Sequence, residues 1–170
     1  ARLTLIHLAI ETMLEGFAAL IFCHTKEETE MLSGSIANNI SCFIKINPAT
    51  TDSVTGGKLK AKLNFSKIST LLDMIDKLPS GLDQALKLRI NFGVAFHHSG
   101  LSNEERSVLE GAFRDGTLRL LCSTTTLSAG VNLPARRVLI SHQFHGKTSF
   151  GNQSQKHLPA SVYHQMAGRA

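Results

Sequence analysis

The chain has 170 residues, of which 42% are hydrophobic and 18% are charged. This length and composition suit one domain that buries its own core, and they argue against a disordered or a membrane-spanning protein. The formal net charge is +5, which by itself gives only weak support to a polyanion-binding surface.

Cysteine usage and the absence of long apolar runs point to a reducing compartment. The cysteines are odd in number and widely spaced, which favours buried thiols over a disulfide framework. They are Cys23, Cys42 and Cys122. The sequence contains no stretch of about 18 apolar residues, and no signal-peptide pattern opens it. We therefore expect an intracellular protein that does not span a membrane.

The beginning of the chain predicts a helix, a strand and a second helix. Apolar side chains recur at helical spacing over residues 3–14, and Gly16 follows as a C-terminal cap. Residues 18–23 form a continuous apolar run, which is typical of a strand buried on both faces. Thr25 and Glu28 match a capping box, so the next helix should begin there.

The segment that follows has no clear periodicity. Pro48 and the pair Gly56-Gly57 interrupt it, and such residues are typical of turns. We therefore predict a loop or an insertion over residues 36–63.

Helical spacing returns further along the chain. Leucine and isoleucine side chains over residues 71–78 predict a helix, the Pro-Ser-Gly sequence at 79–81 ends it, and residues 82–88 predict another helix. The apolar residues 93–96 then predict a buried strand.

A second capping box gives the clearest helix boundary in the chain. Ser102 and Glu105 predict where this helix begins, and the Asp-Gly pair at 115–116 predicts where it ends. Short apolar runs at 118–122 and 138–140 complete a series of strands that alternate with helices. This alternation predicts a parallel α/β sheet with right-handed crossovers.

Polar loops directly follow two of the predicted strands, at residues 97–101 and 123–135. Ligands of open α/β sheets bind at these strand ends. Hydroxyls and backbone amides can bond phosphate oxygens without reading base identity, and Gly130 allows close approach of the main chain. For an isolated run such as 124–126, capping of a short helix is the alternative interpretation.

Four elements in chain order resemble the C-terminal helicase domain of superfamily 2, in the branch that contains archaeal repair helicases, polymerase-theta-like helicases and RNA-exosome helicases. They are residues 20–26, 97–101, 124–135 and 165–170. The resemblance covers nearly the whole chain apart from 36–63 and 141–160. It implies one RecA-like domain over residues 1–170, a three-layer α/β fold with helices flanking a mainly parallel sheet.

Residues 78–83, 93–100 and 110–114 look most like the helicase region of the DNA polymerase theta subfamily, with the polymerase-theta-like helicases second. The resemblance implies the second motor domain of an ATP-dependent DNA helicase acting in DNA repair in the nucleus, on single-stranded or branched DNA. The alternatives are an RNA helicase of the same branch and a non-catalytic nucleic-acid-binding module.

In the family that the chain resembles, ATP and Mg²⁺ are held mainly by an N-terminal RecA-like domain that packs against this one. The resemblance implies that Arg169 is a catalytic residue that meets the triphosphate, since a guanidinium can contact two phosphate oxygens. The other positions implied on the ATP side are Gln165, Gly168, Gly130 and Asn132. Because the phosphate-binding loop and the acidic metal motif belong to that other domain, we expect this chain alone to be inactive. The family motif continues with Gly and a second Arg, often the more direct arginine finger, so we expect the final motif to be truncated at 170.

The same resemblance implies a set of contacts to the nucleic-acid backbone, because translocation along variable sequence requires phosphate readout. The candidates are Thr25, Lys26, His98, Gly100, Thr124 and Thr125. For His98 a structural, hydrogen-bonded role is the alternative. The chain has no Trp and one Tyr, so extensive base stacking on this domain is not expected.

A group of histidines invites a metal interpretation. They are His142, His145, His157 and His164. No cysteine pair stands near them, and their spacing fits no closed four-ligand site. We therefore predict no metal site.

Overall fold

A parallel four-stranded sheet forms the centre of the protein. The computed structural model describes residues 2–45, 52–79, 83–125, 127, 133–141, 145–147, 153–155, 164 and 168. The strands of the sheet are β1 (Ala19–Cys23), β2 (Val94–His97), β3 (Leu120–Thr124) and β4 (Arg137–Ile140). They lie in the order β2-β3-β1-β4, and every pairing between them is parallel. The predicted α/β fold with a mainly parallel sheet is confirmed.

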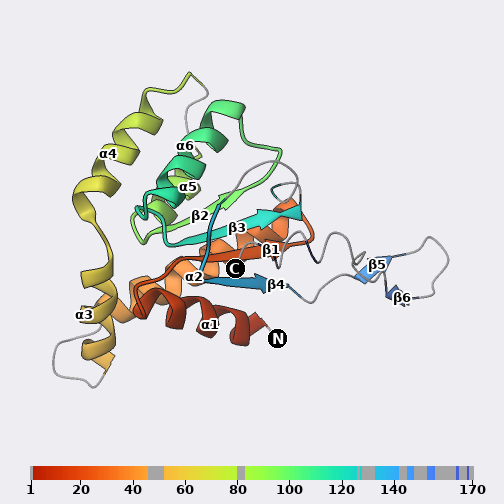
Figure 1. Ribbon diagram of the computed structural model, residues 1–170, viewed down its shortest axis with the longest axis horizontal. Helices are drawn as coiled ribbons and strands as arrows, with labels where there is room; N and C mark the ends of the chain where they lie inside the picture. The colour runs from red at the N-terminus through yellow and green to blue at the C-terminus, as the bar shows by residue number, and fades with distance from the viewer. Residues whose placement is uncertain are drawn as a thin grey trace.

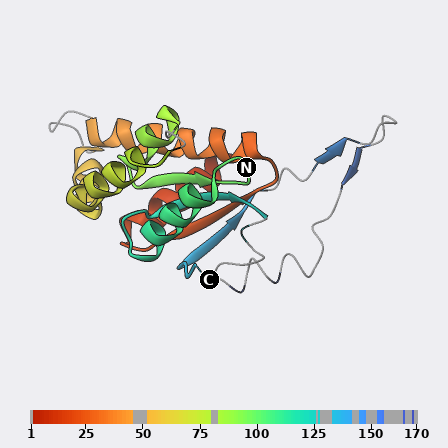
Figure 2. The same cartoon turned by 90° about the horizontal axis from the view of Figure 1, so that it is seen from above.

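Helices cover both faces of this sheet. They are α1 (Arg2–Leu14), α2 (Lys26–Lys45), α3 (Asp52–Lys62), α4 (Phe65–Asp76), α5 (Gln84–Ile90) and α6 (Asn103–Arg114). The connection from β1 to β2 runs one way along the sheet and the connection from β2 to β3 runs back, so right-handed crossovers place α2 and α6 on opposite faces. Figures 1 and 2 show this three-layer arrangement.

The first helix and strand form as their apolar patterns predict. Helix α1 buries Ile6, Ile10 and Met13, and all five residues of β1 are buried. Gly16 ends the helix with a φ of 89°, a left-handed conformation that favours glycine, and its amide donates to the Met13 carbonyl at 2.9 Å. The apolar pattern predicts both elements correctly because the apolar face of α1 and all of β1 are buried in the same core.

The prediction of a loop over residues 36–63 is wrong for its described part. Helix α2 continues to Lys45, and α3 spans Asp52–Lys62. Gly56 lies inside α3, where a Cβ atom would overlap the Phe43 carbonyl oxygen of α2 and lie 2.9 Å from its carbon. The glycine therefore marks a close crossing of two helices rather than a break. Pro48 lies outside the described residues.

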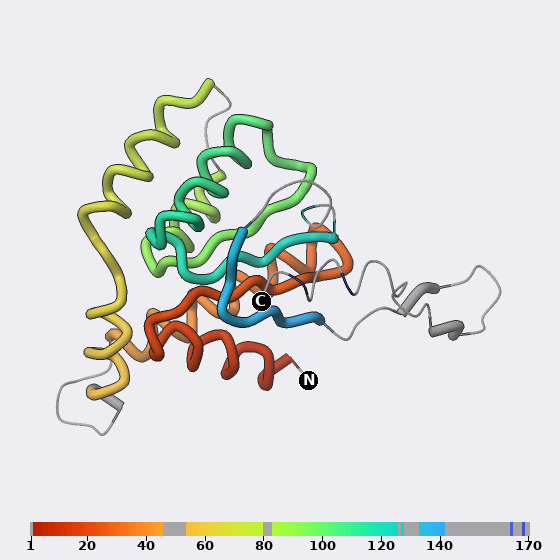
Figure 3. Tube along the Cα trace, viewed as in Figure 1, coloured from red at the N-terminus to blue at the C-terminus, as the bar shows by residue number. Residues whose placement is uncertain are grey.

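The three helices that follow agree with the sequence prediction in kind, with boundaries moved by a few residues. Helix α4 begins earlier than predicted, at Phe65, because the Asn64 side chain accepts from the Lys67 amide at 3.1 Å and caps it. Helix α5 begins after Asp83, which caps the Ala85 amide. In Figure 3, α3 continues into α4 at the end of the sheet from which the strands start.

Both halves of the predicted capping box are present in α6. The Ser102 hydroxyl accepts from the Glu105 amide at 3.1 Å, and the Glu105 carboxylate accepts from the Ser102 amide at 2.6 Å. The helix ends at Asp115, as its Asp-Gly pair predicts. Because this capping box orders the first turn of α6, it also fixes where the loop after β2 ends and the helix begins.

A second, small sheet lies in the polar segment that follows β4. Strands β5 (His145–Lys147) and β6 (Gln153–Gln155) pair antiparallel. The apolar pattern of the sequence predicts no element in this segment. In the part of the chain that the structure describes, no helix has the length and apolarity needed to cross a membrane.

Candidate functional site

The carboxyl ends of β1, β2 and β3 lie side by side at one edge of the sheet. Cys23 at the end of β1 pairs with Thr124 at the end of β3, and His97 at the end of β2 pairs with Ser123. The residues predicted to contact nucleic acid follow or end these strands, so the parallel register gathers them at one edge. They are Thr25, Lys26, His98, Gly100, Thr124 and Thr125.

Thr25 directly precedes α2, and its side chain caps the first turn of the helix. Its hydroxyl oxygen accepts from the Glu28 amide at 3.1 Å. The pKa of Glu27 is lowered by its own backbone amide and, next, by a hydrogen bond with the Thr25 side chain. The Thr25 hydroxyl thus serves first as a helix cap, and its role in strand contact stays a prediction.

The buried Glu28 carboxylate ties the ends of two strands together. It accepts from the His24 amide at 2.9 Å, directly after β1, and from the Ser141 hydroxyl, directly after β4. A standard capping box would use the amide of Thr25 instead, so the predicted box is present only in its first half. Glu28 therefore fixes the exit of β1 relative to β4, a role that sequence reasoning did not assign.

His97 ends β2 and His98 directly follows it, and their side chains reach helices on opposite faces of the sheet, as the alternation of successive residues along a strand predicts. His97 contacts Glu110 of α6, with 2.8 Å between Nε2 and the carboxylate. His98 contacts Glu30 of α2, with 3.1 Å between Nε2 and the carboxylate. Each helix thus supplies one carboxylate to one imidazole, and sequence reasoning missed both partners.

His97 and Ser123 form a buried polar pair at the end of the sheet. Burial lowers the pKa of His97, and the hydrogen bond that the ring donates to the Glu110 carboxylate opposes this shift. Ser123 Oγ lies 3.5 Å from His97 Nδ1 but donates to the Thr124 carbonyl at 3.0 Å. The order of groups is that of a hydrolase triad, yet the serine is buried and its proton is directed at main chain. The arrangement is structural.

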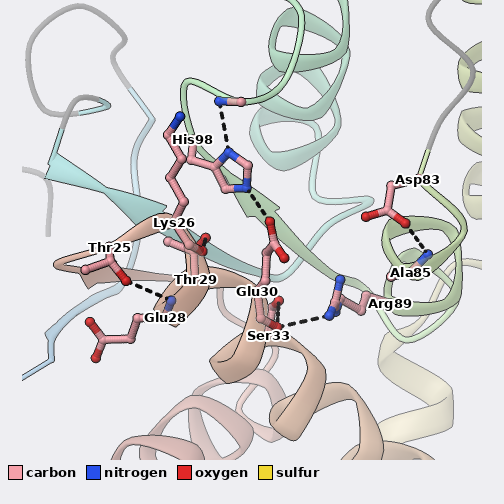
Figure 4. Close-up of polar contacts among 11 residues, drawn as sticks. Thr25, Lys26, Glu28, Thr29, Glu30, Ser33, Asp83, Ala85, Arg89 and His98 are labelled. Carbon is pink, nitrogen blue, oxygen red and sulfur yellow. Dashed lines mark hydrogen bonds and ion pairs between the residues drawn. The ribbon is translucent and has the colours of Figure 1, made fainter.

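His98 has both ring nitrogens engaged within the protein. Gly100 donates its amide to His98 Nδ1 at 3.0 Å, and Nε2 faces Glu30. Figure 4 shows the ring between these two partners, with Lys26 beside it. The histidine is buried, so this geometry favours the hydrogen-bonded structural interpretation, and direct strand contact by His98 stays a prediction.

The turn after β2 borders a groove of about 530 Å³. Glu30, Asp83 and Glu105 bring carboxylates to its walls, and Gly100 brings main chain. The carboxylates are already engaged with His98, with the α5 cap and with the α6 capping box, respectively. The groove therefore lies beside the predicted strand contacts, while its acidic groups stabilise the surrounding structure.

Thr124 and Thr125 lie where β3 ends. Thr124 is buried, and Thr125 is half-buried. Their position opposite the end of β1 agrees with a contact surface shared by the two strand ends. Contact with a nucleic-acid backbone stays a prediction for both.

The predicted nucleotide side is described at one position. Gly168 is exposed, and its amide donates to the His164 carbonyl at 2.9 Å, the spacing of a helical turn. Arg169, Gln165, Gly130 and Asn132 lie outside the described residues. Within those residues, no three metal-binding side chains gather in one place.

Comparison with known proteins identifies the family. The model of the helicase conserved C-terminal domain matches residues 58–170. DNA polymerase theta of Drosophila melanogaster is 39% identical over 163 residues, which are 96% of this chain and 7% of that protein. A human helicase POLQ-like is 36% identical over 161 residues, 95% of this chain and 12% of that protein.

An archaeal relative extends the comparison. The ATP-dependent DNA helicase Hel308 of Caldivirga maquilingensis is 35% identical over 168 residues, which are 98% of this chain and 20% of that protein. The chain thus spans a minor part of each relative. Because the match to Hel308 covers 98% of this chain, it extends into residues 36–63 and 141–160, where no family motif was found. Together with the parallel sheet and the gathered strand-end loops, these matches show that the chain belongs to the helicase conserved C-terminal domain family.

Proposed function

We propose that this chain is the second motor domain of an ATP-dependent DNA helicase, which binds the nucleic-acid backbone and contributes an arginine to an interdomain ATP site. The observation that carries this proposal is the gathering of three strand-end segments at one edge of the sheet. A motor that steps along variable sequence needs contacts to phosphates, and the hydroxyls, amides and lysine of these segments supply them.

On this proposal, ATP with Mg²⁺ lies between this domain and a first RecA-like domain that holds most of the nucleotide. Arg169 reaches the triphosphate when the two domains close, and a guanidinium stabilises the charge that develops during phosphoryl transfer. Gln165, Gly168, Gly130 and Asn132 line the same side.

The relatives named as DNA polymerase theta and as DNA helicase favour DNA as the strand. Repair in the nucleus is part of the same proposal. The test measures ATP hydrolysis by the natural protein that contains this chain, with single-stranded DNA, branched DNA and RNA added in turn. We expect stimulation by DNA. Stimulation by RNA alone would indicate the RNA-helicase alternative, and no stimulation by any strand would indicate a non-catalytic module.

The arginine is tested in the same protein by Arg169→Ala. We expect Arg169→Ala to abolish DNA-stimulated hydrolysis while strand binding is kept, because the guanidinium that contacts the triphosphate is lost. Arg114→Ala removes the same charge from an exposed position on α6 and serves as the control. Full turnover in the Arg169→Ala protein would remove this residue from the ATP site.

A further inference from the structure

A single carboxylate joins two segments of the candidate site that lie far apart in the sequence. Glu30 lies on α2 one helical turn after Lys26, and its Oε1 atom is 3.1 Å from Nε2 of His98, 68 positions along the chain. The first segment begins α2 and the second is the turn after β2. Glu30 is thus the polar connection between the start of α2 and that turn (Figure 4).

Hydrogen bonding fixes the tautomer of the imidazole in this connection. The Gly100 amide donates to His98 Nδ1 at 3.0 Å, so Nδ1 carries the lone pair and the ring proton lies on Nε2. That proton is donated to the Glu30 carboxylate. Because Glu30 accepts from one nitrogen while the other receives the Gly100 amide, the carboxylate sets both the orientation of the ring and the shape of the turn.

Packing leaves the ring little freedom to find another partner. The His98 ring stacks on Phe96 with 5.1 Å between centroids and 10° between planes. Arg89 lies 4.9 Å from the Phe96 centroid, and its Nη2 atom donates to the Glu30 carbonyl at 3.0 Å. Arg89 therefore bonds the backbone of Glu30, while the Glu30 carboxylate accepts from His98.

The turn packs against the start of α2 at Gly100. A Cβ atom at this position would lie 2.9 Å from His98 Cε1 and Nδ1 and 3.9 Å from Lys26 Cδ. Glycine is needed because its main chain comes so close to the imidazole. The same geometry puts the Lys26 side chain next to the turn, so the positions of Lys26, His98 and Gly100 depend on one another.

We propose that Glu30 is a positioning residue for the nucleic-acid track: through His98 it holds the turn after β2 against the start of α2, so that the two segments meet a strand as one preformed surface. This role rests on the proposed function. A surface that is already ordered binds its ligand without a further loss of conformational freedom. Removal of the Glu30 side chain should therefore weaken strand binding and leave the ATP chemistry unchanged.

The loss of the Glu30 charge and the loss of its hydrogen bond to His98 should change the affinity for DNA in opposite directions. Any carboxylate near the track repels a nucleic-acid backbone, so its removal through charge alone should tighten binding. Loss of positioning should do the opposite. Glu104→Ala is the matched control, because Glu104 is an exposed carboxylate at the start of α6 and follows the same turn.

The experiment measures ATP hydrolysis by the full-length protein as a function of single-stranded DNA concentration, at an ionic strength of about 0.1 M. For Glu30→Ala we expect the KM for DNA to rise about fivefold to tenfold, as for the net loss of one ordinary hydrogen bond, and kcat at saturating DNA to stay within about twofold. Glu30→Gln keeps an oxygen that accepts from His98 and should restore the KM. Glu104→Ala should leave the KM equal or lower.

The outcomes distinguish this role from the proposed function. A wild-type protein that no DNA stimulates would overturn both. A stimulated wild-type protein with an unchanged or lower KM in Glu30→Ala would overturn the positioning role alone, and so would a Glu30→Gln protein that behaves like Glu30→Ala. Thermal melting of each variant identifies a general loss of fold, which would lower kcat together with DNA binding.

Discussion

The crossing of α2 and α3 at Gly56 makes a sharp prediction, because α3 carries a second glycine that provides a control. A Cβ atom at Gly56 would overlap the Phe43 carbonyl oxygen and lie 3.3 Å from Ile44 Cα. At Gly57 a Cβ atom would have no atom within 4 Å. The two substitutions Gly56→Ala and Gly57→Ala therefore add the same methyl group to the same helix in opposite environments.

The expected free energies follow from these surroundings. Gly57→Ala should stabilise the protein by about 0.5 to 1 kcal/mol, the difference in helix propensity between the two residues at an exposed position. Gly56→Ala gains the same propensity but must push α3 away from the backbone of α2. Forcing extra volume into a packed contact costs about 1 to 3 kcal/mol, and the overlap here is with main chain, which cannot rotate away. We therefore expect the upper part of that range and a net loss of about 1 to 2.5 kcal/mol.

Urea denaturation followed by circular dichroism measures both variants against the parent protein. We expect the midpoint to rise for Gly57→Ala and to fall for Gly56→Ala, with melting temperatures moving by about 2 to 4 °C per kcal/mol in a chain of this size. A Gly56→Ala protein as stable as Gly57→Ala would refute the close crossing. The packing of α3 against α2 at this position would then be wrong as well.

Two further predictions concern titrating groups. Because burial lowers the pKa of His97 below its ordinary value of 6.5, the unfolded chain takes up a proton near pH 6.5 that the folded chain does not, so the free energy of unfolding should fall as the pH drops from 7 towards 5. Urea midpoints across this range should show a flatter pH dependence for His97→Gln, and an identical slope would contradict the assignment. Burial raises the pKa of Cys23 to about 12 and that of Cys122 well above its ordinary value, while Cys42 is exposed. A thiol-specific reagent at pH 8 should therefore modify Cys42 first and the other two only on unfolding, as peptide mass mapping can show; early modification of Cys122 would contradict its burial.

Local signals in the sequence were sufficient for most of the secondary structure and for the fold class. The capping box at Ser102 and the apolar runs of the strands predicted elements that the structure confirms. Such signals work because a cap or a periodic face acts within one or two turns of the chain. The edge at which the predicted contact residues meet also followed from sequence, since the ends of parallel strands share one edge.

Only the tertiary structure determined which residues, distant in the sequence, pack against one another. From the local sequence, Gly56 is compatible with a loop and with a helix. Its close approach to the Phe43 carbonyl of α2 explains why a glycine lies inside a helix here. His97 at the end of β2 and His98 directly after it are alike in sequence, but the alternation of side chains places His97 against Glu110 and His98 against Glu30. These partners come from helices on opposite faces of the sheet, and which helix covers which face depends on the handedness of the crossovers. Long-range packing, rather than residue type, therefore decided how His98 and its turn are held.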